Sequence, residues 1–105
     1  MPHDYLSGSF DIAQAYYLVN EDAKATKILD ELWKKSTQYM RFNLSLGEDR
    51  IKIQDRSCKI HLSIMQSIAE LMMHIDRTKA ETYSNQLKGI LDKYYSMVGE
   101  YSNNR

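Results

Sequence analysis

The chain has 105 residues, a length that allows one domain with one hydrophobic core and excludes a second domain of ordinary size. Its 14 basic and 14 acidic side chains cancel, which argues against a dedicated binder of nucleic acid or anionic membranes, because such proteins usually carry a positive excess. One proline, four glycines and one cysteine favour long helices and exclude an internal disulfide. We therefore expect a single all-α domain over residues 1–105, with an ordered core of about 9–101.

The first two helices are expected from apolar residues that recur every three to four positions. One covers residues 9–19 with Ser9 as its N-cap, and the next covers residues 21–44 with Asn20 as its cap. The second is the most regular segment of the chain, because lysines and acids occupy the face opposite its apolar stripe. The stripe consists of Ala25, Ile28, Leu29, Leu32, Trp33, Ser36, Tyr39, Met40 and Asn43.

A third helix is expected over residues 45–75. Ser45 and Glu48 have the spacing of a capping box, and Gly47 is suited to the end of the preceding helix. From Ile60 onward the segment is apolar on two faces, so it must be covered on two sides, as the central helix of the domain or as a self-association surface. One face consists of Ile53, Ile60, Ile64, Ile68, Leu71 and Ile75, and the other of Cys58, Leu62, Met65, Ala69, Met72 and Met73.

The fourth expected helix begins at a capping box formed by Thr78 and Glu81, with Asp76 as the alternative cap. Four helices with short connections predict two helical hairpins. The expected fold is therefore all-α, a four-helix, two-hairpin bundle. The apolar residues of the fourth helix are Tyr83, Leu87, Leu91, Tyr94, Val98 and Tyr101.

The first hairpin resembles a tetratricopeptide repeat. Small residues at Ala13 and Ala25 let two helices approach closely, and bulky residues fill the positions beside them. Ser9 stands where that repeat has an early tryptophan, and Thr37 where it has a closing proline. The resemblance implies a tetratricopeptide-like bundle. The matching positions are Ile12, Ala13, Tyr16, Ala25, Leu29 and Leu32.

A second resemblance covers Asp11 to Tyr101. It rests on Ala15-Tyr16-Tyr17, Ala23-Lys24-Ala25, Ile28, Tyr39 and Asn43-Leu44-Ser45-Leu46. These residues are similar to the helical C-terminal tail of a bacterial family of multi-pass membrane proteins, whose membrane part is similar to protein O-mannosyltransferases. Phe42 departs from the tyrosine-like ring of that tail. The resemblance implies that the natural protein continues upstream of Met1, that any transferase activity belongs to that part, and that the tail carries no catalytic residue.

Cys58 and His61 are the residues closest to a chemical site. They lie at i and i+3 of the third helix, one turn after Asp55. A structural zinc site needs four ligands, and a nucleophilic thiol needs a base and an oxyanion hole, neither of which the sequence provides. We interpret the pair as a buried thiol beside a surface or boundary histidine. No catalytic residue, cofactor or metal is expected, and a small-molecule ligand is not expected either.

The remaining candidate surfaces are a basic cluster and the tyrosines. The basic cluster consists of Arg50, Lys52, Arg56 and Lys59, of which the last three form the stripe. Neighbouring acids dilute it, and it is interpreted as a solvated helix face. The eight tyrosines and six methionines are of types that are frequent at binding surfaces, but tyrosines also pack at the core boundary and methionines more often fill the core. The residues predicted to form an interaction surface are Tyr5, Tyr95, Tyr101, Met65, Met72 and Met73.

The function expected from these observations is that of a non-catalytic helical scaffold or interaction domain, the soluble C-terminal tail of a larger membrane glycosyltransferase-like protein. The alternative is a stand-alone small helical homodimer that associates through the third helix. A third alternative, from the enzyme class, is a metal or thiol site at Cys58 and His61. The partner is expected to be a protein or a second copy, with no nucleic acid and no direct insertion of this segment into a membrane.

Overall fold

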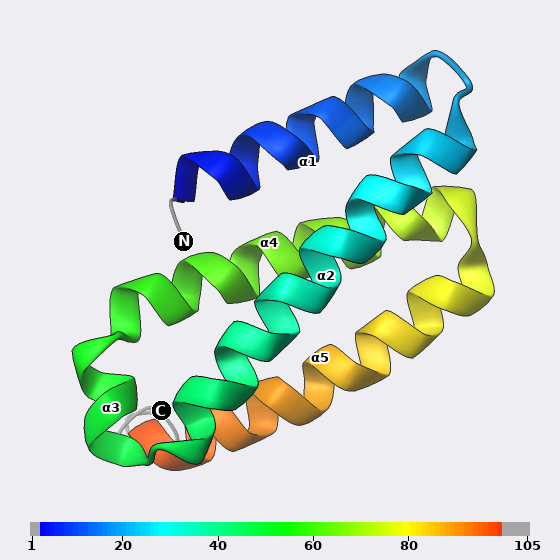
Figure 1. The fold of residues 1–105 in the computed structure, drawn as a ribbon. Coiled ribbons are helices and arrows are strands. Elements are labelled where there is room, and N and C mark those ends of the chain that lie inside the picture. The colour runs from blue at the N-terminus through cyan, green and yellow to red at the C-terminus, as the bar shows by residue number, and fades with distance from the viewer. Residues whose placement is uncertain (1–2, 100–105) are drawn as a thin grey trace.

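The structure, a computed structural model, describes residues 3–99, and within this range the chain is helical with no strand. This confirms the all-α fold. The described part contains five helices (Figure 1), where the sequence predicted four. They are α1 (His3–Leu18), α2 (Asp22–Ser45), α3 (Glu48–Ile53), α4 (Asp55–Ile75) and α5 (Arg77–Val98).

The helices form two antiparallel hairpins, α1 with α2 and α4 with α5, with the short α3 at the turn between them (Figure 1). Helix α2 crosses in front of α4 and contacts α1, α4 and α5. The body measures 43 × 27 × 23 Å, so the two long hairpins set its length. All five helices contribute buried residues to its core.

Helix α1 begins at His3, six residues earlier than the sequence predicted, and Ser9 lies inside it rather than at its cap. The extension is explained by Leu6, which is fully buried and lies two turns before the buried Ala13 on the same face. Asn20 ends the hairpin turn with a left-handed backbone, φ 65°, a conformation that asparagine tolerates. It does not cap α2, whose first turn follows Glu21.

The predicted third helix is divided at Gln54 into α3 and α4. The predicted capping box at Ser45 does not form, because Ser45 Oγ donates to the backbone oxygen of Phe42 at 2.6 Å and Gly47 precedes α3. Gly47 has φ +97°, which favours glycine. The break lets α3 turn Ile51 fully into the core, while Ile53 stays 76% exposed.

Helix α4 shares the centre of the domain with α2, because α4 contacts α1, α2 and α5 in the same way that α2 contacts α1, α4 and α5. Both of its apolar faces are therefore covered mainly within one chain, which explains the pattern that the sequence showed. Met73 is the exception on the second face, since it remains exposed. The buried residues of α4 are Cys58, His61, Leu62, Met65, Ile68, Ala69, Leu71 and Met72.

Helix α5 starts at the alternative cap that the sequence offered. The side chain of Asp76 accepts a hydrogen bond from the backbone N–H of Lys79 at 3.1 Å, and Thr78 lies inside the helix. The predicted stripe faces the core, with Leu91 only partly buried. Tyr101, its last predicted member, lies outside the described residues.

Candidate functional site: a groove between α4 and α5

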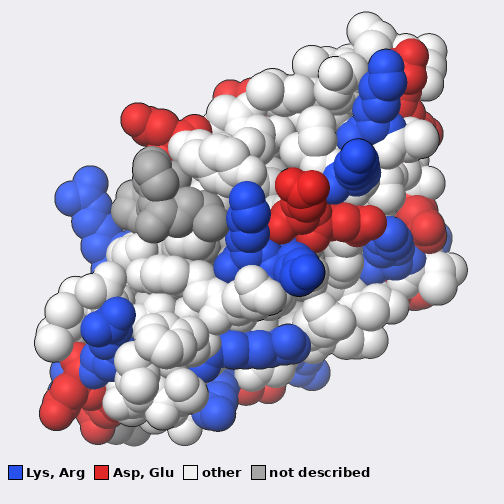
Figure 2. All heavy atoms as spheres, in the orientation of Figure 1, with Lys and Arg blue, Asp and Glu red and all other residues white. Residues whose placement is uncertain are grey.

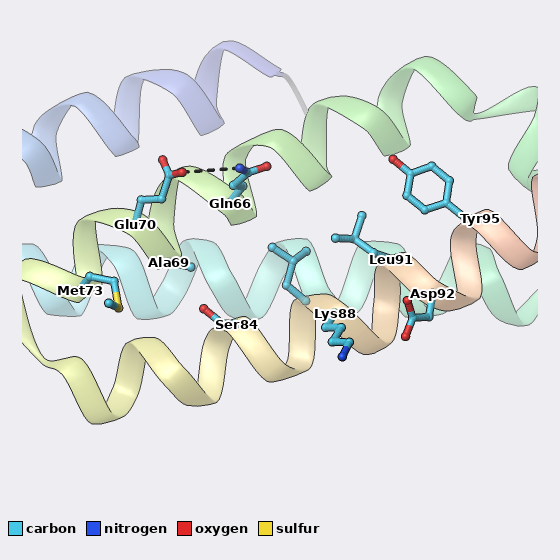
Figure 3. A pocket seen from close by; sticks show the side chains of 10 residues that line it. Gln66, Ala69, Glu70, Met73, Ser84, Lys88, Leu91, Asp92 and Tyr95 are labelled. Carbon is cyan, nitrogen blue, oxygen red and sulfur yellow. Dashed lines mark hydrogen bonds between the residues drawn. The ribbon is translucent and has the colours of Figure 1, made fainter. Parts of the chain in front are cut away.

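An open groove of about 480 Å³ runs between α4 and α5, on the side of the hairpin away from α2 (Figure 3). We call it the α4–α5 groove. Its walls come from the facing sides of the two antiparallel helices. The lining residues are Gln66, Ala69, Glu70 and Met73 from α4, and Ser84, Leu87, Lys88, Leu91, Asp92 and Tyr95 from α5.

The floor and ends of the α4–α5 groove are apolar. Ala69 and Leu87 are buried at its floor, and Leu91 is partly buried beside them. Met73 and Tyr95 lie at opposite ends and are 41% and 47% exposed. With the buried floor, these two side chains give the α4–α5 groove a mainly apolar lining, and burial of that lining would be favourable.

The rim of the α4–α5 groove carries charges of both signs. On α4, Gln66 Nε2 lies 3.5 Å from Glu70 Oε2, an exposed contact (Figure 3). On α5, Lys88 and Asp92 are exposed and one helical turn apart. A rim of mixed charge around an apolar floor is the usual arrangement of a protein interface.

Contacts between α2 and α5 hold α5 in place on its other side. The rings of Trp33 and Tyr83 stack with centroids 4.2 Å apart and planes 9° apart, and Trp33 Nε1 donates to Gln86 Oε1 at 2.7 Å. The Tyr83 hydroxyl donates to Asp30, whose other oxygen lies 2.8 Å from Lys79 Nζ. Burial, with the hydrogen bond to Asp30, raises the pKa of Tyr83, so its hydroxyl remains a donor at neutral pH.

A second polar contact fixes the far end of α5 against the start of α4. The Tyr94 hydroxyl donates to Asp55, which also pairs with Lys59 at 3.0 Å. Burial pushes the pKa of Asp55 upward, but the hydrogen bonds from Tyr94 and Lys59 outweigh it, so the pKa lies below its ordinary value. Asp55 therefore acts here as a charged acceptor that ties two helices together.

The structure separates the six residues predicted to form one interaction surface. Met73 and Tyr95 both line the α4–α5 groove. Tyr5 is exposed on α1, where Lys35 Nζ donates to its hydroxyl at 2.9 Å and lies 4.6 Å from its ring centroid. Met65 and Met72 are fully buried, so they are core residues and not surface residues; Tyr101 lies outside the described residues.

Cys58 and His61 both lie inside the core. The predicted surface or boundary position of His61 is wrong, because its side chain is fully buried, stacks on Tyr39 with centroids 4.0 Å apart, and places Nδ1 3.2 Å from Ser36 Oγ. Burial, then the nearby Asp55, raises the pKa of the Cys58 thiol to about 11, so it stays protonated at neutral pH. Among the described residues, no three histidine, cysteine or acidic side chains form a group that could hold a metal ion.

The basic cluster that the sequence singled out is largely engaged within the chain. Lys52 Nζ lies 3.3 Å from Glu48, and Arg50 Nε donates to Asn43 Oδ1 at 2.8 Å. Lys59 pairs with Asp55 as described above. These contacts fix α3 and the start of α4, and they do not create a continuous basic field.

Comparison with protein-family models, curated proteins and solved structures finds no match for this chain. None of the helices in residues 3–99 is long and apolar enough to cross a membrane. The sequence pattern identified Ala69, Leu87 and Leu91 as apolar stripe residues. It could not reveal the groove between them, because the groove exists only through the packing of α4 against α5.

Proposed function

We propose that this chain is a non-catalytic helical assembly domain, and that it associates with a second copy of itself through the α4–α5 groove. The observation that carries the proposal is the exposure of Met73 and Tyr95 along one groove whose floor is apolar. A second copy that covers this groove removes both side chains from water.

Two-fold symmetry can place the positive and negative charges of one copy's groove opposite charges of the other sign in the second copy. A two-fold axis that crosses α5 midway between Lys88 and Asp92 makes the two α5 helices antiparallel. Lys88 of each copy then lies opposite Asp92 of the other, so two ion pairs flank the axis. Leu91 lies next to the axis and packs against its own symmetry mate.

The size of the face also suits a self-associating domain. Helices α4 and α5 have 21 and 22 residues, so each extends about 32 Å. With axes about 10 Å apart, the two helices present a face roughly 20 Å wide, or about 650 Å². This is slightly below the ~800 Å² per partner of a standard interface. We expect a reversible dimer with a Kd in the micromolar range.

Charge exchange at the two-fold axis tests this pairing. Lys88→Glu brings two carboxylates together across the axis, and Asp92→Lys brings two lysines together, so each single variant is expected to weaken association about tenfold. Mixing the two single variants restores opposite charges at both positions and should recover a heterodimer by sedimentation velocity. The double variant should recover the homodimer.

The double variant is also the control for folding, because it contains both substitutions. Both positions are exposed, so circular dichroism should show the same helical content in all variants. Single variants that associate as tightly as the parent chain, or a mixture that stays monomeric, would contradict the proposed interface.

We further propose that this domain is the C-terminal tail of a larger membrane protein of the glycosyltransferase-like family. The support is the sequence resemblance that covers the range from Asp11 to Tyr101, together with the resemblance of the first hairpin to a tetratricopeptide repeat. In such a protein the tail brings two chains together, and any transferase chemistry lies in the part that the tail follows.

An antibody raised against this domain tests the tail proposal on fractionated source cells. We expect a band in the membrane fraction that is much heavier than 12.3 kDa. A band at 12.3 kDa in the soluble fraction would contradict the tail, while leaving self-association to be judged by the charge exchange.

A further inference from the structure

A second groove, of about 420 Å³, lies on the other side of α5, between α5 and the C-terminal half of α2. We call it the basic groove. Among the described residues that line it, the charged ones are Arg41 and Lys93, and both are positive. The lining within residues 3–99 consists of Arg41 and Leu44 from α2, and Asn85, Gln86, Gly89, Ile90 and Lys93 from α5.

Within residues 3–99 no carboxylate forms an ion pair with the positive charges of the basic groove, those of Arg41 and Lys93. Between Leu32 and Gly47 the chain carries three basic residues and no acidic one. In Figure 2, lysine and arginine side chains lie over the C-terminal half of α2 and the adjoining part of α5, whereas the carboxylates at the centre of this face lie nearer the N-terminal half of α2.

The basic groove combines an apolar floor with open space. Leu44 and Ile90 are buried at the floor. Gly89 lines the groove, and a Cβ built there would meet nothing within 4 Å. A glycine inside a helix lowers stability relative to alanine, and no atom of residues 3–99 comes close enough to a Cβ at this position to require one. The space above Gly89 is therefore available to a side chain from outside the molecule.

Two amide side chains, those of Asn85 and Gln86, add hydrogen-bond donors to the walls of the basic groove. Trp33 Nε1 can only donate, so the Gln86 atom that it contacts is the carbonyl oxygen, and the amide nitrogen of Gln86 keeps N–H donors. Asn85 is exposed one residue away. Asn85 and Gln86 line the same basic groove as Arg41 and Lys93.

We propose that the basic groove binds an acidic amphipathic helix of a partner protein. Its carboxylates pair with Arg41 and Lys93, and an apolar side chain enters the space above Gly89. From Asn85 to Lys93 the groove follows α5 for about 12 Å, which matches about two turns of a docked helix. Nucleic acid fits less well, because it requires a wider basic field than two cations on a chain of zero net charge.

The probe for this site is a fluorescein-labelled synthetic helical peptide of about fourteen residues, with leucine on one face and glutamate beside it. The matched control peptide has lysine in place of every glutamate. We expect the acidic peptide to bind with micromolar affinity by fluorescence anisotropy, and the lysine peptide to bind at least about tenfold more weakly. The amide NMR signals of Asn85, Gln86 and Gly89 should shift on binding.

Two variants locate the binding to the basic groove. Arg41→Glu combined with Lys93→Glu should reverse the preference, so that the lysine peptide binds better than the acidic one. Gly89→Leu places a side chain in the hollow, where a Cβ would meet nothing within 4 Å, and should weaken binding of the acidic peptide about tenfold. Gly8→Leu is its matched control, because Gly8 is also exposed inside a helix with nothing within 4 Å of a built Cβ.

Several outcomes would overturn the proposal. They are no binding of the acidic peptide, equal binding of both peptides, and shifts confined to the α4–α5 groove. A single-stranded oligonucleotide that displaces the peptide from Gly89 and binds more tightly would assign the groove to nucleic acid instead. The result does not depend on self-association, because the two grooves lie on different sides of α5.

Discussion

Ile68→Asp is expected to remove a large part of the stability of the domain. Ile68 is fully buried in the centre of α4, where that helix is covered by its neighbours. The substitution places an unpaired carboxylate in an apolar environment, which costs more than about 4 kcal/mol in a domain whose total stability is roughly 5–15 kcal/mol. Far-ultraviolet circular dichroism with urea titration measures the loss.

Ser63→Asp is the matched control for Ile68→Asp. Ser63 lies on the same helix but is exposed, so the same carboxylate remains in water. Its free energy of unfolding should stay within about 0.5 kcal/mol of the parent chain. An Ile68→Asp variant with an unchanged urea midpoint would show that α4 is not one of the central helices.

Trp33→Ala is expected to lower the free energy of unfolding by about 3–5 kcal/mol. Trp33 is 4% exposed and joins α2 to α5 through its stack on Tyr83 and its hydrogen bond to Gln86. Removing the indole leaves a cavity between the two hairpins and exposes the face of Tyr83. Urea titration followed by circular dichroism reports the change without relying on tryptophan fluorescence.

Gln86→Ala separates the hydrogen bond of Trp33 from its packing. It removes the acceptor and leaves the ring stack in place, so the expected loss is about 1 kcal/mol. Equal losses for Trp33→Ala and Gln86→Ala would show that the stack contributes little to holding the hairpins together.

Much of the fold follows from local patterns in the sequence. The buried residues of α2 include Ala25, Leu29 and Leu32 of the predicted stripe, because a 3.6-residue apolar period determines which face is buried. The helix ends were less predictable. The early start of α1 depends on Leu6 reaching the core, and the break at Gln54 depends on Ile51 turning inward. Both are tertiary effects that override local propensity.

The candidate site was predictable only in part. Sequence pattern selected Met73 and Tyr95, which line the α4–α5 groove, but it grouped them with Met65 and Met72, which are in the core. Consecutive residues such as Met72 and Met73 point about 100° apart on a helix, so one can be buried and the other exposed. Which of the two faces outward depends on where α5 packs, and the sequence does not encode that position locally.

The basic groove had no counterpart in the sequence prediction. The predicted basic stripe around Arg56 joins residues that are close in sequence, whereas Arg41 and Lys93 are far apart along the chain. The segment from Leu32 to Gly47 can be recognised in the sequence because it is long and has no acidic residue. The same pattern does not reveal Lys93, because Lys93 comes beside that segment only through the packing of α5 on α2.

Self-association through the α4–α5 groove is most directly tested by sedimentation equilibrium of the unmodified chain over a range of concentrations. The proposal predicts that the apparent mass rises from 12.3 kDa toward twice that value as the concentration passes through the micromolar range. A mass that stays at 12.3 kDa up to millimolar concentration would contradict it.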